Sequence, residues 1–125
     1  MQITSTALSL TVTDPEASGR FLTDHFGFGV AMAAPGFVSL TREDAGINVI
    51  FLATGLPTMP ADQRDVHATG LILAFVVEDL EGELARLQAE GVAITMPLTV
   101  EEWGERAFQV RGPNGVVVQL VDWKG

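Results

Sequence analysis

The sequence has no cysteine and only two histidines among its 125 residues. The lack of cysteine excludes a disulfide framework, a thiolate zinc site, an iron–sulfur cluster and a cysteine nucleophile. No apolar run approaches the ~20 residues of a membrane span, and the N-terminus MQITSTALSLTVTD lacks the basic start and cleavage site of a secretory signal. We therefore expect a cytoplasmic protein with no membrane partner, in which any metal would need His, Asp, Glu or Gln as ligands.

Basic residues are also scarce. Seven bases, of which only Lys124 is a lysine, face sixteen acids, so the formal net charge is −9. Such a field repels phosphate backbones, and we expect no nucleic-acid partner. The acid excess has two open explanations, solubility or attraction of a cationic or amine-bearing ligand. A hydrophobic content of 47% is enough for a core, and the length allows one compact domain made of two half-sized units.

The first half of the chain predicts a strand, a helix and three strands. Residues 6–13 alternate between apolar and small or polar side chains, which is the period of a half-buried strand. Asp14, Pro15 and Glu16 form a helix start, and this helix is expected to end near Phe26, before Gly27. Three short strands separated by turns are then predicted at residues 28–34, 37–42 and 47–53. Residues 1–53 are thus a βαβββ module.

Residues 54–69 contain two prolines and no apolar periodicity, so they are predicted to be a linker. Residues 70–125 then repeat the first pattern. A strand at 71–77 precedes a helix that begins after Asp79 and ends before Gly91, and the segment VAITMP at 92–97 begins the next strand. The last two strands are predicted at about 106–111 and 116–123.

The two halves align when the helix-start aspartates, at 14 and 79, are superposed. The same offset places Leu10 on Phe75 and Val12 on Val77, which indicates an internal repeat. Neither half can bury both faces of its sheet alone. We therefore predict an α+β fold in which two βαβββ modules form a cup-shaped half-barrel sheet, with helices outside and function on the concave face.

Three segments in this order carry a resemblance to a known family. They are DPEASGRFLTDHFGF at 14–28, EDLEGELARLQAEGV at 78–92 and WGERAFQVRGPNGVVVQL at 103–120. This pattern resembles the vicinal oxygen chelate superfamily, which includes glyoxalase I, extradiol dioxygenases, fosfomycin-modifying enzymes and bleomycin-resistance binding proteins. The resemblance covers nearly the whole chain.

Enzymes of that superfamily hold a divalent metal on the concave face through His, Glu or Gln side chains. The resemblance places the matching positions here at Ala7, Ile50, Ile72 and Gln119. One weak oxygen donor among three apolar side chains does not make a metal site. We accordingly predict no metal and no other cofactor.

No catalytic residues are predicted. His25 is expected in the last turn of the first helix, and His67 lies in the linker, so neither is placed on the concave face. Glu101, Glu102 and Glu105 are possible acid–base groups, but a solvated charged loop is the favoured interpretation.

Without metal ligands, the predicted cup has a mainly apolar lining suited to a flat, bulky organic molecule. Trp103 lies in a stretch similar to the PWGREF segment of bleomycin-resistance proteins, where an exposed indole offers a stacking surface. The predicted ligand-binding residues are Ser9, Thr11, Phe37, Asn48, Ile50, Met96, Trp103, Arg106, Gln119 and Trp123.

Several of these residues have a second interpretation. Trp103 can simply cover a sheet edge, and Trp123 can serve a dimer contact. Met96 can fill a gap in the core rather than touch a ligand. Arg106 can pair with a neighbouring acid instead of donating to a ligand carbonyl.

The resemblance favours a metal-independent protein that sequesters an aromatic natural product, such as a bleomycin-, mitomycin- or enediyne-like antibiotic. Bleomycin-resistance proteins are small acidic homodimers, so a homodimer is expected. Arg111-Gly112-Pro113 replaces the Arg-Asp-Pro turn of those proteins, which implies a different ligand choice. The alternatives are a glyoxalase- or dioxygenase-like isomerase or lyase of the same fold, and a regulatory module acting through its dimer surface.

Overall fold

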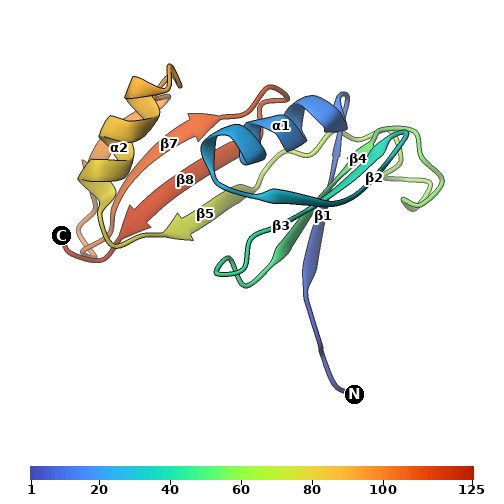
Figure 1. Ribbon diagram of the computed structural model, residues 1–125, viewed down its shortest axis with the longest axis horizontal. Helices are drawn as coiled ribbons and strands as arrows, with labels where there is room; N and C mark the ends of the chain where they lie inside the picture. The colour runs from blue at the N-terminus through green and yellow to red at the C-terminus, as the bar shows by residue number, and fades with distance from the viewer. The chain divides into compact units, whose positions relative to one another are not determined.

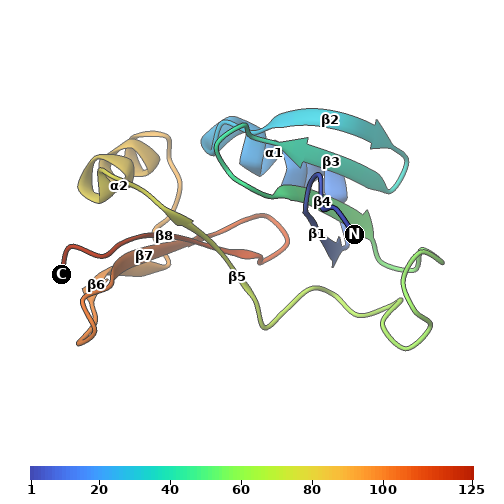
Figure 2. The same cartoon turned by 90° about the horizontal axis from the view of Figure 1, so that it is seen from below.

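The computed structural model describes all residues from 1 to 125, and the chain divides into two compact units, Met1–Thr69 and Gly70–Gly125. The first unit contains β1 (Ala7–Val12), α1 (Pro15–His25), β2 (Gly29–Ala34), β3 (Phe37–Thr41) and β4 (Asn48–Ala53). The second contains β5 (Ile72–Val76), α2 (Leu80–Ala89), β6 (Met96–Val100), β7 (Arg106–Arg111) and β8 (Val117–Asp122). Figure 1 labels all of these elements except β6, which is labelled in Figure 2. The predicted α+β class and the two βαβββ modules are confirmed.

Each unit has one four-stranded sheet with the same topology. The strand orders are β1-β4-β3-β2 and β5-β8-β7-β6, and Figure 2 shows the first four strands side by side. The first strand of each unit runs parallel to the last, β1 to β4 and β5 to β8, while the other neighbours are antiparallel. In each unit the helix connects the first strand, at one edge of the sheet, to the second strand, at the opposite edge, and the two following antiparallel strands return the chain to lie beside the first.

The repeat is visible in how the two helices begin. The Asp14 side chain accepts a hydrogen bond from the Ala17 amide at 3.1 Å, and the Asp79 side chain accepts one from the Gly82 amide at 3.1 Å. Both aspartates satisfy a backbone donor that would otherwise lack a partner in the first helical turn. The helix starts inferred from the sequence are therefore correct in both units.

The helix of each unit packs against one face of its sheet. In the first unit, Leu22 of α1 is buried with Leu10, Val12, Leu40 and Val49 of the strands. In the second unit, the buried side chains include Leu80 and Leu87 of α2 with Phe108, Val110 and Leu120 of the strands. We call the opposite face of each sheet, which no helix of its own unit covers, its open face.

Residues 54–69 form a series of turns that belong to the first unit. The Thr54 amide donates to the Val12 carbonyl at 3.1 Å, and the Ala68 amide donates to the Thr11 carbonyl at 2.7 Å. Both ends of this segment are thus hydrogen-bonded to β1. Residues 54–69 are therefore held against the first sheet at both of their ends.

Most predicted strands extend one residue too far at one or both ends, and the differences at β6 and β8 bear on predicted site residues. Residues 92–95 are not in a strand, and β6 begins only at Met96. Its pairing with β7 shifts register between Met96 and Thr99, where Pro97 has no amide hydrogen to donate. At the other end of the unit, β8 stops at Asp122, so Trp123 lies outside the strand. Neither helix of the structure is long and apolar enough to cross a membrane.

Candidate functional site

The open face of the first sheet has a row of side chains that crosses all four strands. Strand register places Ser9, Ile50, Ser39 and Met32 in this row. Their neighbours Leu10, Val38, Leu40 and Val49 are buried on the helix side. Alternation along each strand therefore leaves hydroxyl, aliphatic and thioether groups on the open face.

The second sheet has the equivalent row, made of Ala74, Gln119, Gln109 and Met96. Gln109 Nε2 donates a hydrogen bond to Gln119 Oε1 at 2.8 Å. The remaining amide groups of the pair can still donate to or accept from a ligand. An amide pair between apolar neighbours can thus orient a molecule that lies flat on this face.

The sequence-predicted residues of the first unit fall largely on the open face. Ser9 is exposed, while Phe37, Asn48 and Ile50 are half-buried. Asn48 also lines a hollow of about 400 Å³ together with Thr41, Arg42 and residues 4–6. Thr11 differs, because it is buried and its hydroxyl donates to the Val66 carbonyl. Residues 66–68 therefore cover Thr11 in this structure.

Arg106 lies on the helix side of the second sheet and not on its open face. It is in register with Asp122, which is buried, and its Nε donates to Asp122 Oδ1 at 2.9 Å. The same guanidinium pairs with Glu81 of α2 at 2.5 Å. The acids that Arg106 pairs with are thus Glu81 and Asp122, rather than the neighbouring loop acids considered from the sequence.

These contacts shift the ionisation of all three groups. The hydrogen bonds from Arg106 lower the pKa of the Asp122 carboxyl to about 2, and its hydrogen bonds to Glu81 lower the pKa of that carboxyl too. The hydrogen bonds with Asp122 and then Glu81 raise the pKa of Arg106. The cluster is an ion-pair network that joins α2 to β7 and β8. These contacts attach the start of α2 to the sheet of the second unit.

Trp103 and Trp123 are both exposed, to 66% and 59% of their surface. Trp103 lies in the loop between β6 and β7, which is closed by a hydrogen bond from the Glu101 amide to the Glu105 carbonyl at 2.7 Å. The Gly125 amide donates to the Gly104 carbonyl at 3.0 Å, so the chain end after Trp123 is attached to the loop of Trp103. The two indoles thus lie at the same end of the second unit, beside Glu101, Glu102 and Glu105.

Comparison with known proteins identifies the family. The model of the Glyoxalase/Bleomycin resistance protein/Dioxygenase superfamily matches residues 3–120. The chain belongs to this superfamily. The resemblance inferred from the sequence is confirmed, while a search of curated proteins finds no match.

Several solved structures are similar in fold to this chain. TnmS3, an antibiotic binding protein from Streptomyces sp. CB03234, is 26% identical with a TM-score of 0.73, and the match covers 98% of this chain and 98% of that chain. TioX from Micromonospora sp. ML1 is 24% identical with a TM-score of 0.72 over 96% of this chain and 98% of that chain. A lactoylglutathione lyase from Agrobacterium tumefaciens is 18% identical with a TM-score of 0.76 over 95% and 92% of the two chains.

The residues at the positions that the resemblance assigns to a metal do not fit a metal ion. Ala7, Ile50 and Ile72 have no donor atom, and Ile72 exposes 51% of its surface as a bare aliphatic group. The Gln119 oxygen already accepts the hydrogen bond from Gln109. No three His, Cys, Asp or Glu side chains of the chain are grouped as a metal site would require.

Sequence reasoning missed Ser39, Gln109 and Asp122. Ser39 and Gln109 complete the two open-face rows, and strand alternation was the signal for both, since each lies between two apolar residues. Asp122 is two and four residues beyond Leu120 and Val118, both buried on the helix side. A charged residue on the buried face of a strand needs a partner of opposite charge, which here is Arg106.

Proposed function

We propose that this protein binds and sequesters an aromatic small-molecule natural product without a metal, and so gives resistance to it. A bleomycin-, mitomycin- or enediyne-like antibiotic is the class of ligand that we infer. The observation that supports this most is the chemistry of Ala7, Ile50, Ile72 and Gln119. Apolar and amide groups stand where superfamily enzymes hold an ion, which favours binding over Lewis-acid catalysis.

The open faces offer the contacts that such a ligand needs. Ile50 and Met96 provide apolar surface, and Met96 can adapt its shape to an irregular molecule. Gln119 provides hydrogen bonds that select an orientation. The exposed indoles of Trp103 and Trp123 provide stacking surfaces, which add about 0.5–1.5 kcal/mol beyond the buried area. Ser9, Phe37 and Asn48 complete the proposed contacts.

The similarity to TnmS3 supports the same class of function. TnmS3 is described as an antibiotic binding protein, and the two chains match over almost their whole lengths. The likeness to the lactoylglutathione lyase is a likeness of fold alone, at 18% identity. An isomerase or lyase activity has no set of side chains here to support it, so binding remains our proposal.

Metal analysis tests the first part of the proposal. Protein purified without a chelator is expected to contain no stoichiometric Zn²⁺, Mn²⁺, Fe²⁺ or Ni²⁺. One equivalent of a divalent ion, retained through gel filtration, would overturn metal independence and favour the enzyme alternative.

Tryptophan fluorescence tests binding. Bleomycin, a mitomycin and an enediyne are titrated into the protein, and each is then recovered and checked by mass spectrometry. We expect saturable quenching by at least one compound, recovered unaltered. Because the two tryptophans are the only ones, Trp103→Ala and Trp123→Ala show which indole reports the ligand. A chemically altered compound, or no saturable quenching by the whole panel, contradicts sequestration.

A variant of the amide pair tests where the ligand lies. Gln119→Leu is expected to weaken binding of the quenching compound by about fivefold, since one neutral hydrogen bond contributes about 1 kcal/mol. Gln88→Leu, which changes an exposed amide on α2, is the matched control and should leave the affinity unchanged. Equal affinities for both variants would remove Gln119 from the proposed site.

We also propose, from the resemblance to bleomycin-resistance proteins, that the chain forms a homodimer. Sedimentation velocity at micromolar concentration is expected to give twice the mass of one chain. A monomer mass with and without the quenching compound would contradict this.

A further inference from the structure

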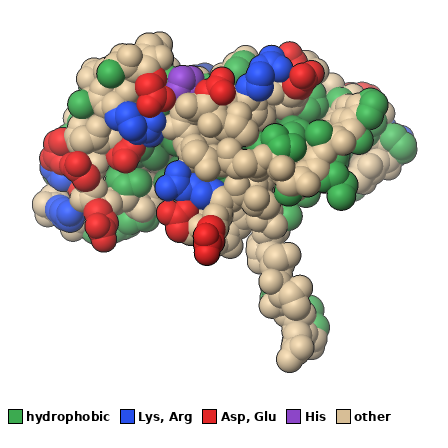
Figure 3. Space-filling view, in the orientation of Figure 1, with side chains coloured by type: hydrophobic (Ala, Val, Ile, Leu, Met, Phe, Trp, Pro, Cys, Tyr) green, Lys and Arg blue, Asp and Glu red, His purple; other side chains and the backbone are tan.

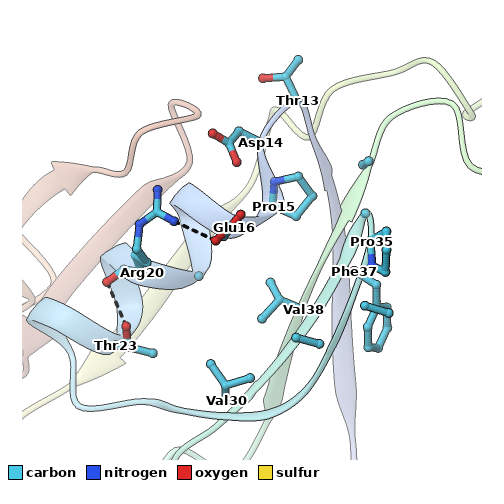
Figure 4. A pocket seen from close by; sticks show the side chains of 15 residues that line it. Thr13, Asp14, Pro15, Glu16, Arg20, Thr23, Val30, Pro35, Phe37 and Val38 are labelled. Atoms are coloured by element: carbon cyan, nitrogen blue, oxygen red, sulfur yellow. Dashed lines mark hydrogen bonds and ion pairs between the residues drawn. The ribbon is translucent and has the colours of Figure 1, made fainter.

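A groove lies between α1 and the β2–β3 hairpin of the first unit, on the helix side of the sheet. Its volume is about 760 Å³. Figure 4 shows α1 on one side of this groove and Val30 and Val38 directed into it from the strands. The groove therefore lies mainly on the face opposite to the one on which we place the sequestered ligand, although Phe37, at the start of β3, lines the groove as well.

The groove exists because α1 packs closely on β3 and leaves β2 uncovered. A Cβ atom at Gly19 would lie only 3.2 Å from Val38 Cγ1, so glycine lets the helix approach β3. All six residues of β2 are exposed, and Val30 exposes 56% of its surface. Ala33, which also lines the groove, has only a methyl group as its side chain. The width of the groove therefore depends on small residues on both of its sides, Gly19 on α1 and Ala33 on β2.

The lining combines an apolar floor with a charged rim. Val30, Ala33 and Val38 form the floor, and Figure 3 shows apolar side chains gathered beside α1 over this part of the sheet. Asp14 and Glu16 line the groove from the start of α1, and Arg20 pairs with Glu16 at 3.3 Å. Two carboxylates and one guanidinium leave this rim with an excess negative charge.

We propose that this groove is a second binding site, for a small aromatic molecule that carries an amine. Its volume lies within the range of about 300–1,000 Å³ that is typical of small-molecule sites. Val30, Ala33 and Ala34, which are all exposed, supply the apolar surface that an aromatic ring would bury. The carboxylates of the rim and the net charge of −9 favour a protonated amine over a neutral or anionic group.

The charge preference is testable with three compounds that share one ring. Tryptamine, indole and indole-3-acetate are titrated into the ¹⁵N-labelled full chain, and amide shifts are followed by NMR. We expect saturable shifts at Gly19, Thr23, Val30 and Ala33, with tryptamine binding about threefold more tightly than indole and indole-3-acetate binding most weakly. Equal affinity for tryptamine and indole-3-acetate would overturn the assignment of a cationic ligand.

Filling the groove tests the location. Ala33→Leu places a larger side chain among the lining residues and is expected to reduce tryptamine affinity at least about tenfold. Ala31→Leu makes the same change on the same strand at a residue that does not line the groove, so it should bind tryptamine like the parent. Tryptamine shifts that survive Ala33→Leu, or that centre on other residues, would overturn the site.

The internal repeat provides a control for the charge of the rim, because Asp79 caps α2 as Asp14 caps α1. Asp14→Asn removes a carboxylate charge while keeping an oxygen that can cap α1, and Asp79→Asn makes the same change at the start of α2. Only Asp14→Asn is expected to lower tryptamine affinity, by about threefold, with indole affinity unchanged. An equal effect of both variants would show a general field rather than a rim contact. If the groove does not bind tryptamine, quenching of Trp103 and Trp123 by antibiotics is still expected. The groove and the sequestration site are therefore tested independently.

Discussion

The charged cluster of Asp122, Arg106 and Glu81 is the residue-scale feature with the largest expected effect on stability. Asp122 is almost fully buried, and Arg106 supplies hydrogen bonds to both of its oxygens. Removing Arg106 would leave a carboxylate without its partner inside the unit, which is far more destabilising than losing an exposed ion pair. Glu81, which is exposed, should matter much less than Asp122.

This cluster predicts a specific pH dependence. The pKa of Asp122 is lowered to about 2 in the folded chain, whereas an unfolded aspartate titrates near ~3.9. The folded state therefore favours the ionised carboxyl, and this contribution is complete above about pH 5 and is lost as pH falls through 4 towards 2. We expect the urea concentration at the unfolding midpoint of the parent to decrease over this pH range and to approach that of Asp122→Asn.

Urea denaturation of the parent and Asp122→Asn at pH 7, 5, 4 and 3 measures this. The gap between the two midpoints should narrow below pH 5. Asp24→Asn makes the same change at an exposed residue of α1 and is the matched control. A gap for Asp122→Asn that stays constant from pH 7 to pH 3 would show that the cluster does not control acid stability.

At the scale of elements, both helices begin with an aspartate cap, and loss of either cap should lower the free energy of unfolding by a similar amount. Asp14→Ala and Asp79→Ala each leave one amide of the first helical turn without its acceptor. Each is expected to cost about 1 kcal/mol in the free energy of unfolding, and Asn at either position should restore most of it. Urea denaturation monitored by circular dichroism is the measurement, and a loss that Asn does not restore would argue against a capping role.

The segment of residues 54–69 provides a second prediction at this scale. Thr11→Val keeps the shape of the side chain but removes the hydroxyl that donates to Val66. We expect faster hydrogen exchange at the Ala68 amide and faster proteolysis within residues 54–69, with a stability loss of about 1 kcal/mol. Ser9→Ala, at an exposed position of the same strand, should leave both rates unchanged. Unaltered exchange at Ala68 in Thr11→Val would show that the hydroxyl does not hold the segment.

These elements also show what the sequence could and could not predict. Helix caps and strand alternation are local signals, so the two modules and the positions of Ile50 and Gln119 in them were predictable. The contact of Thr11 with Val66 joins residues 55 positions apart through a segment without periodicity, and nothing local indicates it. Arg106 was misplaced for a different reason. Its strand has apolar residues on both faces, Ala107 on one and Phe108 on the other, so alternation alone did not decide which face is buried.

At the scale of the whole molecule, the acid excess is shared by both units. Residues 1–69 contain seven acids and three bases, and residues 70–125 contain nine acids and four bases. A cationic ligand therefore meets a negative field wherever it approaches either unit. The open faces therefore need no local acid cluster to attract it, whereas at the groove beside α1 the rim carboxylates Asp14 and Glu16 add to this field.

This field predicts that salt weakens the binding of cationic compounds but not of neutral ones. The screening length falls from about 30 Å at 0.01 M salt to about 3 Å at 1 M, so distant carboxylates stop contributing while contact surfaces remain. Affinity for a cationic antibiotic should fall several-fold between these conditions, whereas apolar burial is maintained or strengthened for an uncharged one. Fluorescence titrations at four salt concentrations, with KCl as the only variable, measure both. If the cationic and uncharged ligands lost affinity in parallel, the net charge of −9 would serve solubility alone, and selection of the ligand would depend only on shape and stacking.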